Sequence, residues 1–82
     1  MNKEHMVVFT KSNCPNCVSA KQLLKAKGME FTEHSMDNAM EREDFLAKYP
    51  ELKQMPQIFY RGERIGGFAG LREWIKWKEG QK

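Results

Sequence analysis

Hydrophobic residues fall in short runs along the chain, and their spacing alternates between that of a strand and that of a helix. Residues 6–10 form a continuous apolar and β-branched run, which is typical of a strand buried on both faces. After a polar turn, one helical face carries Cys17, Ala20 and Leu24. The pattern predicts a helix over residues 15–27.

The residues that flank this helix favour helix ends. Pro15 suits a first helical position, where its missing N–H costs nothing, and Gly28 follows basic residues of the last turn. Residues 29–35 then read as a second strand. A strand, a helix and a strand in succession predict a βαβ unit with a parallel strand pair and a right-handed crossover.

The second half of the chain repeats the alternation with shorter elements. Asn38, followed three residues later by Glu41, is the pattern of a helix cap, and Pro50 ends that helix. Residues 51–55 read as a polar loop and residues 56–60 as a third strand.

The last part of the chain predicts a hairpin and a helix. Residues 61–63 form a tight turn, residues 64–65 begin a short fourth strand, and the glycine pair 66–67 breaks it. An amphipathic helix closed by Gly80 completes the order β-α-β-α-β-β-α in a single domain, residues 1–82. The core of the last two helices is expected to contain Phe45, Tyr49, Leu71, Trp74 and Ile75.

Composition and charge exclude several classes of function. The chain carries 14 basic and 11 acidic residues, a net charge of +3, without the clustered basic stripe of a nucleic-acid-binding protein. The apolar stretch at residues 6–9 is shorter than the ~7 residues of a signal peptide core or the ~20 of a membrane helix. We therefore expect a cytoplasmic monomer with neither nucleic acid nor membrane as a partner.

The two cysteines of the chain, Cys14 and Cys17, stand at a strand-to-helix junction. The loop between them is too short to constrain the unfolded chain, so they are not expected to serve stability. A helix N-terminus stabilises a thiolate, which favours a redox dithiol. The same spacing is half of a zinc site, but no second pair exists, and His5 and His34 do not supply ligand spacing, so we expect no metal.

The residues also assign a role to each cysteine. Cys14, at the cap position with Lys11 close by, is expected to be the exposed nucleophile, its thiolate stabilised by backbone N–H groups of Asn16 and Cys17. Cys17, one turn further and on the apolar face, is expected to resolve the mixed disulfide formed at Cys14.

Three segments resemble those of the glutaredoxins, within the thioredoxin superfamily. Residues 10–17 are similar to the glutaredoxin active-site segment, residues 55–59 to the segment with the family's cis-proline, and residues 65–68 to its glycine-pair segment. The resemblance runs nearly end to end and is strongest to short phage and bacterial dithiol glutaredoxins. It implies the thioredoxin-like α/β fold, with a four-stranded mixed sheet flanked by helices.

The resemblance changes the expectation for Pro56. The residues alone favour a trans bond, because only about 5–6% of X–Pro bonds in folded proteins are cis. The resemblance implies a cis bond, which leaves the backbone of Met55 free to pair with an extended substrate peptide that faces Cys14.

The resemblance also implies a site for glutathione as reductant. Gly67, Phe68 and Ala69 would bind its γ-glutamyl carboxylate through backbone N–H groups at a helix start, Lys11 would pair with its glycyl carboxylate, and Asn16 would line the site. The chain departs from the family at three positions, where an acidic or hydroxyl residue, a tyrosine and a threonine are usual: Ala69, Asn16 and Gln54.

The function implied is that of a dithiol glutaredoxin, which passes electrons from glutathione to disulfides of proteins, ribonucleotide reductase among the candidates, and to glutathione mixed disulfides. One alternative keeps this chemistry but takes electrons from a thioredoxin reductase. Another is a binding module in which two copies bridge an iron–sulfur cluster through Cys14 and glutathione; Pro15 and Cys17 argue against it, because cluster-binding relatives usually lack one or both. A zinc-binding or purely structural fragment is the remaining alternative.

Overall fold

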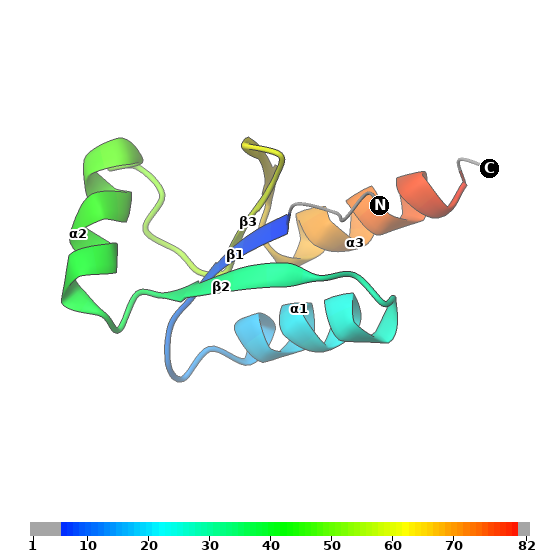
Figure 1. Ribbon diagram of the computed structural model, residues 1–82, viewed down its shortest axis with the longest axis horizontal. Coiled ribbons are helices and arrows are strands. Elements are labelled where there is room, and N and C mark those ends of the chain that lie inside the picture. Colours follow the sequence, from blue (N-terminus) through cyan, green and yellow to red (C-terminus); the bar gives the residue numbers. More distant parts are fainter. Residues whose placement is uncertain (1–5, 81–82) are drawn as a thin grey trace.

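The computed structural model describes residues 6–80, which fold into four strands and three helices (Figure 1). In chain order the elements are β1 (Met6–Thr10), α1 (Pro15–Ala26), β2 (Phe31–Ser35), α2 (Ala39–Lys48), β3 (Gln57–Tyr60), β4 (Glu63–Gly66) and α3 (Phe68–Glu79). This is the predicted order β-α-β-α-β-β-α.

The strands form one mixed sheet in the order β2-β1-β3-β4. β1 pairs in parallel with β2 and antiparallel with β3, and β3 pairs antiparallel with β4. The parallel pair and the crossover helix α1 make up the predicted βαβ unit. The β1 strand therefore lies inside the sheet, and the loop after it carries both cysteines.

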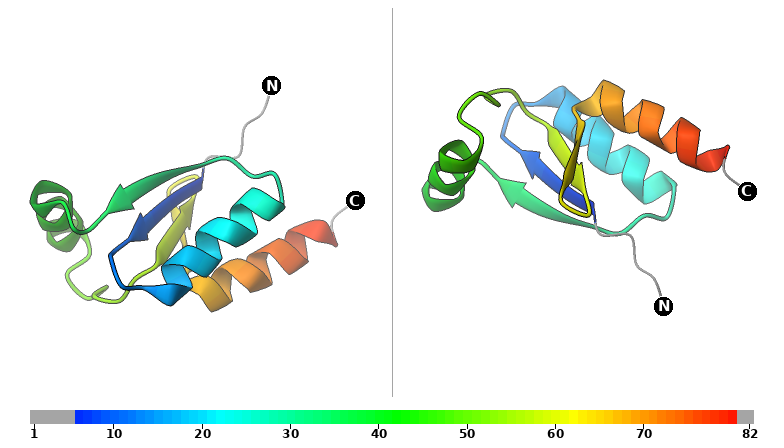
Figure 2. Two further views of the ribbon diagram at one scale, coloured as in Figure 1. Left: turned by 90° about the horizontal axis from the view of Figure 1, so that it is seen from below. Right: turned by 90° about the horizontal axis from the view of Figure 1, so that it is seen from above.

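Helices α1 and α3 run side by side over one face of the sheet (Figure 2). The core between them and the sheet is closed, because its side chains are at most 3% exposed. Its members are Met6, Val8, Ala20, Leu24, Ile58, Leu71 and Ile75.

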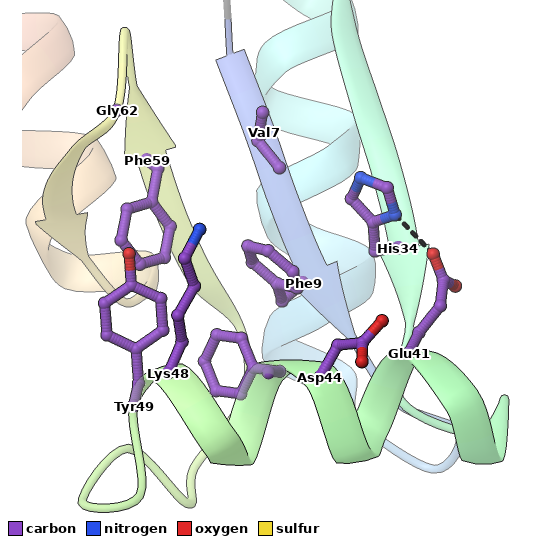
Figure 3. A pocket seen from close by; sticks show the side chains of 10 residues that line it. Val7, Phe9, His34, Glu41, Asp44, Lys48, Tyr49, Phe59 and Gly62 are labelled. Atoms are coloured by element: carbon purple, nitrogen blue, oxygen red, sulfur yellow. Dashed lines mark hydrogen bonds and ion pairs between the residues drawn. The ribbon is translucent and has the colours of Figure 1, made fainter.

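Helix α2 lies over the opposite face, at one end of the sheet (Figure 1). Among the described residues, the buried hydrophobic cluster on this side has three members, Met36, Phe45 and Phe59. Val7 and Phe9 of β1 are half-buried, so the prediction of a strand buried on both faces is wrong for this side. The reason is that α2 covers only part of the face and leaves a cavity of about 390 Å³ between its own polar side chains and the sheet (Figure 3).

Several element ends follow from single hydrogen bonds. Asn38 caps α2 as predicted, since its side-chain oxygen accepts from the Glu41 N–H at 3.0 Å. The Glu41 carboxylate does not return to the cap but contacts His34 Nδ1 at 2.5 Å. The Met29 N–H donates to the Leu24 carbonyl, which finishes α1 and explains why β2 begins at Phe31 rather than at Met29.

The β3–β4 hairpin turn is one residue shorter than predicted. Arg61 and Gly62 both have positive φ, 52° and 85°, which matches the two-residue turn that fits the twist of paired strands. Glu63 therefore pairs with Tyr60 inside the ladder rather than in the turn. β3 begins at Gln57, one residue after the expected start at Pro56, which has no N–H to donate to a ladder.

The helices between residues 6 and 80 are all too short or too polar to cross a membrane.

Candidate active site

The cysteine pair closes the first turn of α1. Cys14 is the N-cap residue and forms a disulfide with Cys17, with 5.2 Å between the two Cα atoms. The Cys17 N–H donates to Cys14 Sγ at 3.1 Å, while the Cys14 carbonyl accepts from the N–H groups of Cys17 and Val18. Because the Cys17 N–H donates to this sulfur at a helix N-terminus, negative charge on it is stabilised.

The backbone contact predicted for Cys17 is confirmed, but within residues 6–80 the Asn16 N–H makes no hydrogen bond to Cys14 Sγ. Asn16 itself is exposed on the first turn of α1.

The two cysteine residues differ in exposure in the predicted order. Cys17 is 2% exposed and Cys14 is 9% exposed. The expectation of an open Cys14 is wrong in degree: its Sγ lies 3.6 Å from the Met55 carbonyl oxygen, which covers it together with Cys17. In the disulfide this sulfur has no proton to donate, whereas a reduced Cys14 thiol has one and faces a carbonyl acceptor.

The Met55–Pro56 peptide bond is cis, as the resemblance implied and as the residues alone did not. Pro56 is buried, and its carbonyl faces Gly67 so closely that a Cβ on that glycine would lie 3.4 Å from it. The three segments singled out in the sequence therefore meet: the Cys14 loop touches Met55, and the proline touches the glycine pair.

Gly67 is the N-cap of α3, and no side chain caps this helix. Its carbonyl accepts from the Leu71 N–H at 2.9 Å, so α3 begins directly after it. Phe68 is half-buried and Ala69 is exposed in the first turn. The helix start thus presents backbone N–H groups beside the cis-proline segment, an arrangement that suits an anion.

Lys11 stands three residues before Cys14. It is exposed and lines, with Met55, a groove of about 340 Å³. A cation therefore shares this groove with Met55, the residue whose carbonyl oxygen lies beside Cys14 Sγ.

A hydrogen-bond network around Gln57, two residues after Met55, was not anticipated from the sequence. Gln57 is 5% exposed; its amide nitrogen donates to the Gln54 carbonyl at 2.9 Å, and its amide oxygen accepts from Arg64 Nε at 2.9 Å. This arrangement closes the turn that carries Met55 and Pro56. The only sequence signal was a polar residue inside an apolar strand.

A second unanticipated network ties the end of β1 to β2 and α1. Thr10, which is 3% exposed, donates through its hydroxyl to the Glu33 carboxylate at 2.7 Å, and Lys21 Nζ lies 2.9 Å from the same oxygen. Hydrogen bonds from Lys21 and then Thr10 lower the pKa of Glu33 below its ordinary value. The network fixes the strand from which the cysteine loop emerges.

No group of three or more His, Cys, Asp or Glu side chains in the described part of the chain is arranged to hold a metal ion. His34 lies against Phe9 and pairs with Glu41 on the α2 side of the sheet. His5 falls outside the described residues.

The similarity to known proteins agrees with this geometry. The sequence profile of the glutaredoxin family matches residues 6–65. The chain belongs to the glutaredoxin family. It is 43% identical over 65 residues to glutaredoxin 3 of Escherichia coli, an alignment that covers 78% of this chain and 77% of that protein. It is also 43% identical over 61 residues to a probable glutaredoxin of Synechocystis, covering 73% and 69%.

Among solved structures, glutaredoxin 1 from Francisella tularensis superposes with a TM-score of 0.79 at 27% identity, covering 95% of this chain and 99% of that one. The thioredoxin-like glutaredoxin fold predicted from the sequence is confirmed. The protein is a glutathione-dependent thiol–disulfide oxidoreductase, and the Cys14–Cys17 disulfide is its redox-active group.

Proposed function

We propose that this glutaredoxin reduces protein disulfides and glutathione mixed disulfides, with Cys14 as nucleophile and Cys17 as resolving thiol. The Cys14 thiolate attacks one substrate sulfur, forms a mixed disulfide and releases the other sulfur as a thiolate, which takes up a proton. The Cys17 thiolate then attacks Cys14, frees the second substrate thiol and leaves the Cys14–Cys17 disulfide. Two glutathione thiols reduce this disulfide and become one glutathione disulfide.

The division of roles rests on the environment of the two sulfurs. Cys14 is the more exposed and sits at the helix N-cap, where the Cys17 N–H donates to its sulfur. Cys17 is buried in the first turn, so its thiolate attacks only the neighbouring Cys14 sulfur, once that sulfur is bound to the substrate. A thiolate at the exposed position starts the exchange, and a neighbouring thiol completes it.

The glutathione site proposed here spans the two sides of the disulfide. The N–H groups at Gly67, Phe68 and Ala69 would hold the γ-glutamyl carboxylate, and Lys11 would pair with the glycyl carboxylate. Asn16 would line the same site from the first turn of α1. Every one of these groups is a donor or a cation, which suits a ligand with two carboxylates.

The Met55 backbone, held beside Cys14 and followed by the buried Pro56, is proposed to pair with an extended segment of the substrate. Ribonucleotide reductase is the substrate protein that we propose to test first. We further propose that the protein acts as a monomer in the cytoplasm.

The electron donor decides between this proposal and a donor role served by a thioredoxin reductase. Ala69 favours the second possibility, because it provides neither an acidic group for the γ-glutamyl amine nor a cap for α3. The test is reduction of a small mixed disulfide with glutathione plus glutathione reductase, and in parallel with thioredoxin reductase. We expect turnover in the first system. No turnover there, with robust turnover in the second, would overturn the glutathione assignment.

A matched variant sharpens this test. Ala69→Asp introduces the acidic group that is usual in the family at the first turn of α3, where it also favours the helix start. We expect the KM for glutathione to fall while the rate with a dithiol reductant stays the same. An unchanged KM would show that the α3 start does not contact glutathione.

A further inference from the structure

A groove of about 340 Å³ lies along α2 and reaches Lys11 and Met55, which flank the cysteine loop. Its volume lies within the range of about 300–1,000 Å³ that is common for ligand sites. Its apolar lining comes from the β2–α2 connection, from α2 itself and from the loop before β3: Met36, Phe45, Leu46, Leu52 and Met55.

The groove and the reacting sulfur share one neighbour, Met55. Met55 lines the groove, and the Met55 carbonyl oxygen lies 3.6 Å from Cys14 Sγ. Lys11, three residues before Cys14, lines it as well. A chain whose cysteine is joined to Cys14 therefore has this groove within reach of the residues that flank that cysteine.

The charged side chains that line the groove are mostly cationic. Lys11, Arg42 and Lys53 contribute positive charge, and Asp37 is the one carboxylate among the described lining residues. The Asp37 carboxylate already accepts a hydrogen bond from the Ser12 N–H at 3.3 Å. The field in the groove thus favours acidic groups.

The walls of the groove are fixed by hydrogen bonds. Arg42 Nη1 donates to the Met36 carbonyl at 3.2 Å, which ties α2 to the segment before it. The Met36 N–H donates to the Thr10 carbonyl at 2.7 Å, which extends the pairing of β1 and β2 to the groove. The groove is therefore preformed, and a ligand need not order it.

Glutathione alone does not account for this lining. It has two carboxylates but no large apolar side chain, whereas five of the nine residues that line the groove are large and apolar, and one of them, Leu46, is 38% exposed. A peptide segment that carries a large apolar side chain and an acidic side chain matches both the apolar lining and the cations of the groove.

We propose that this groove binds the residues next to the reactive cysteine in protein substrates, and that it selects flanks that combine a large apolar residue with an acidic one. The inference rests on the proposed function, because it assigns the substrate class of the same cysteine pair. It predicts that charge and apolar character at the flank set the rate of exchange, while disulfides without a flank do not sense the groove.

The experiment uses peptides that carry one intramolecular disulfide. The flanks of the cysteines hold leucine and glutamate, leucine and lysine, or serine and glutamate. Stopped-flow measurement of their reduction by the reduced full chain gives a second-order rate constant for each, and hydroxyethyl disulfide serves as the substrate without a flank. We expect the leucine–glutamate peptide to react roughly ten times faster than the leucine–lysine peptide at low salt, with the difference shrinking as salt is added.

Two groove variants have matched controls on the same helix or with the same charge. Lys53→Glu is compared with Lys48→Glu, because Lys48 lines the other cavity, and Leu46→Ser is compared with Met40→Ser, which is 75% exposed and does not line the groove. The groove variants should lower the ratio of the leucine–glutamate rate to the hydroxyethyl disulfide rate by roughly threefold or more. The control variants should leave that ratio unchanged.

The possible failures are distinguishable. Equal rates for all three peptides, with hydroxyethyl disulfide still reduced, overturn the groove proposal and leave the proposed function intact. An equal loss of rate for peptides and hydroxyethyl disulfide in Lys53→Glu also overturns it, because the groove then acts on the thiol pair rather than on the flank. No reduction of any disulfide contradicts the proposed function itself.

Discussion

The two faces of the sheet are covered in different ways. On the α1 and α3 side, Val8, Ala20, Leu24 and Leu71 are completely buried, and the disulfide sits at the end of this closed layer. On the α2 side, few residues are buried, and two cavities of about 390 and 340 Å³ lie beside the helix. Figure 3 shows polar side chains of α2, among them Glu41 and Lys48, standing along the edge of the larger cavity.

This difference separates stability from recognition. The closed face holds Cys14 at a fixed helix N-terminus, so its geometry does not depend on what binds. The open face keeps apolar surface and cations accessible next to the same sulfur. We infer that substitutions on the first face act mainly on the free energy of unfolding, and substitutions on the second face act mainly on which substrates react.

The largest expected effect tests this separation with two leucines. Leu71→Ala removes a completely buried side chain and should lower the free energy of unfolding by about 2–5 kcal/mol. Leu46→Ala removes a side chain that is 38% exposed and should cost under ~1 kcal/mol. Urea unfolding followed by circular dichroism measures both. Similar losses in the two variants would mean that the two faces contribute equally to the free energy of unfolding.

Substitutions at Gly70 and Gly80 test how tightly α3 is packed on the closed face. A Cβ on Gly70 would lie 2.7 Å from the Ile65 carbonyl oxygen, so Gly70→Ala forces α3 and β4 apart and should cost about 1–3 kcal/mol. Gly80→Ala is the control, because the nearest atom to its Cβ would be 3.5 Å away. Thermal unfolding should separate the two variants clearly. A Gly70→Ala protein as stable as the control would contradict the tight contact.

The cap of α2 tests the open face. Asn38→Ala removes the acceptor for the Glu41 N–H and should cost about 1 kcal/mol. Because the loss is confined to α2, hydrogen exchange should accelerate in that helix and stay unchanged in α1. Asn38→Ser, which keeps an acceptor, is the matched control. Equal acceleration in both helices would show that the two faces unfold as one unit.

The smallest effect concerns Glu33. Its lowered pKa means that it stabilises the fold at neutral pH, above its ordinary pKa of about 4.5, and that this contribution disappears as the pH falls through the lowered value. Both it and Lys21 are about one-third exposed, so we expect only a few tenths of a kcal/mol. The gap in stability between the unaltered chain and Glu33→Gln should close on going from neutral to acidic solution. A gap that widens in acidic solution would mean that folding raises the pKa of Glu33 rather than lowering it.

The sequence was sufficient for the features set by local chemistry. Cys14 and Asn38 cap helices as their side chains suggest, and Gly28 follows α1 with a φ of +70°. Features that depend on partners distant in the chain were not accessible. Gln57 is buried because Arg64 and the Gln54 carbonyl satisfy its amide, and neither contact leaves a pattern in the sequence.

The burial of individual aromatic residues was predicted less well than their positions. Trp74 was expected in the core but is half-buried, because it packs against Tyr60 at the end of β3. Tyr49 is half-buried for a related reason, since it lies at the end of α2, where the layer over the sheet is thin. Helical spacing identifies a face, but it does not tell how completely the neighbouring layer covers that face.

The central claim is that Cys14 attacks and Cys17 resolves. It is tested most directly by Cys14→Ser and Cys17→Ser, each assayed on a glutathione mixed disulfide and on a protein disulfide. We predict that Cys14→Ser loses both activities, and that Cys17→Ser keeps the first, loses the second and accumulates a mixed disulfide detectable by mass spectrometry. A dead Cys17→Ser protein beside an active Cys14→Ser protein would reverse the two roles.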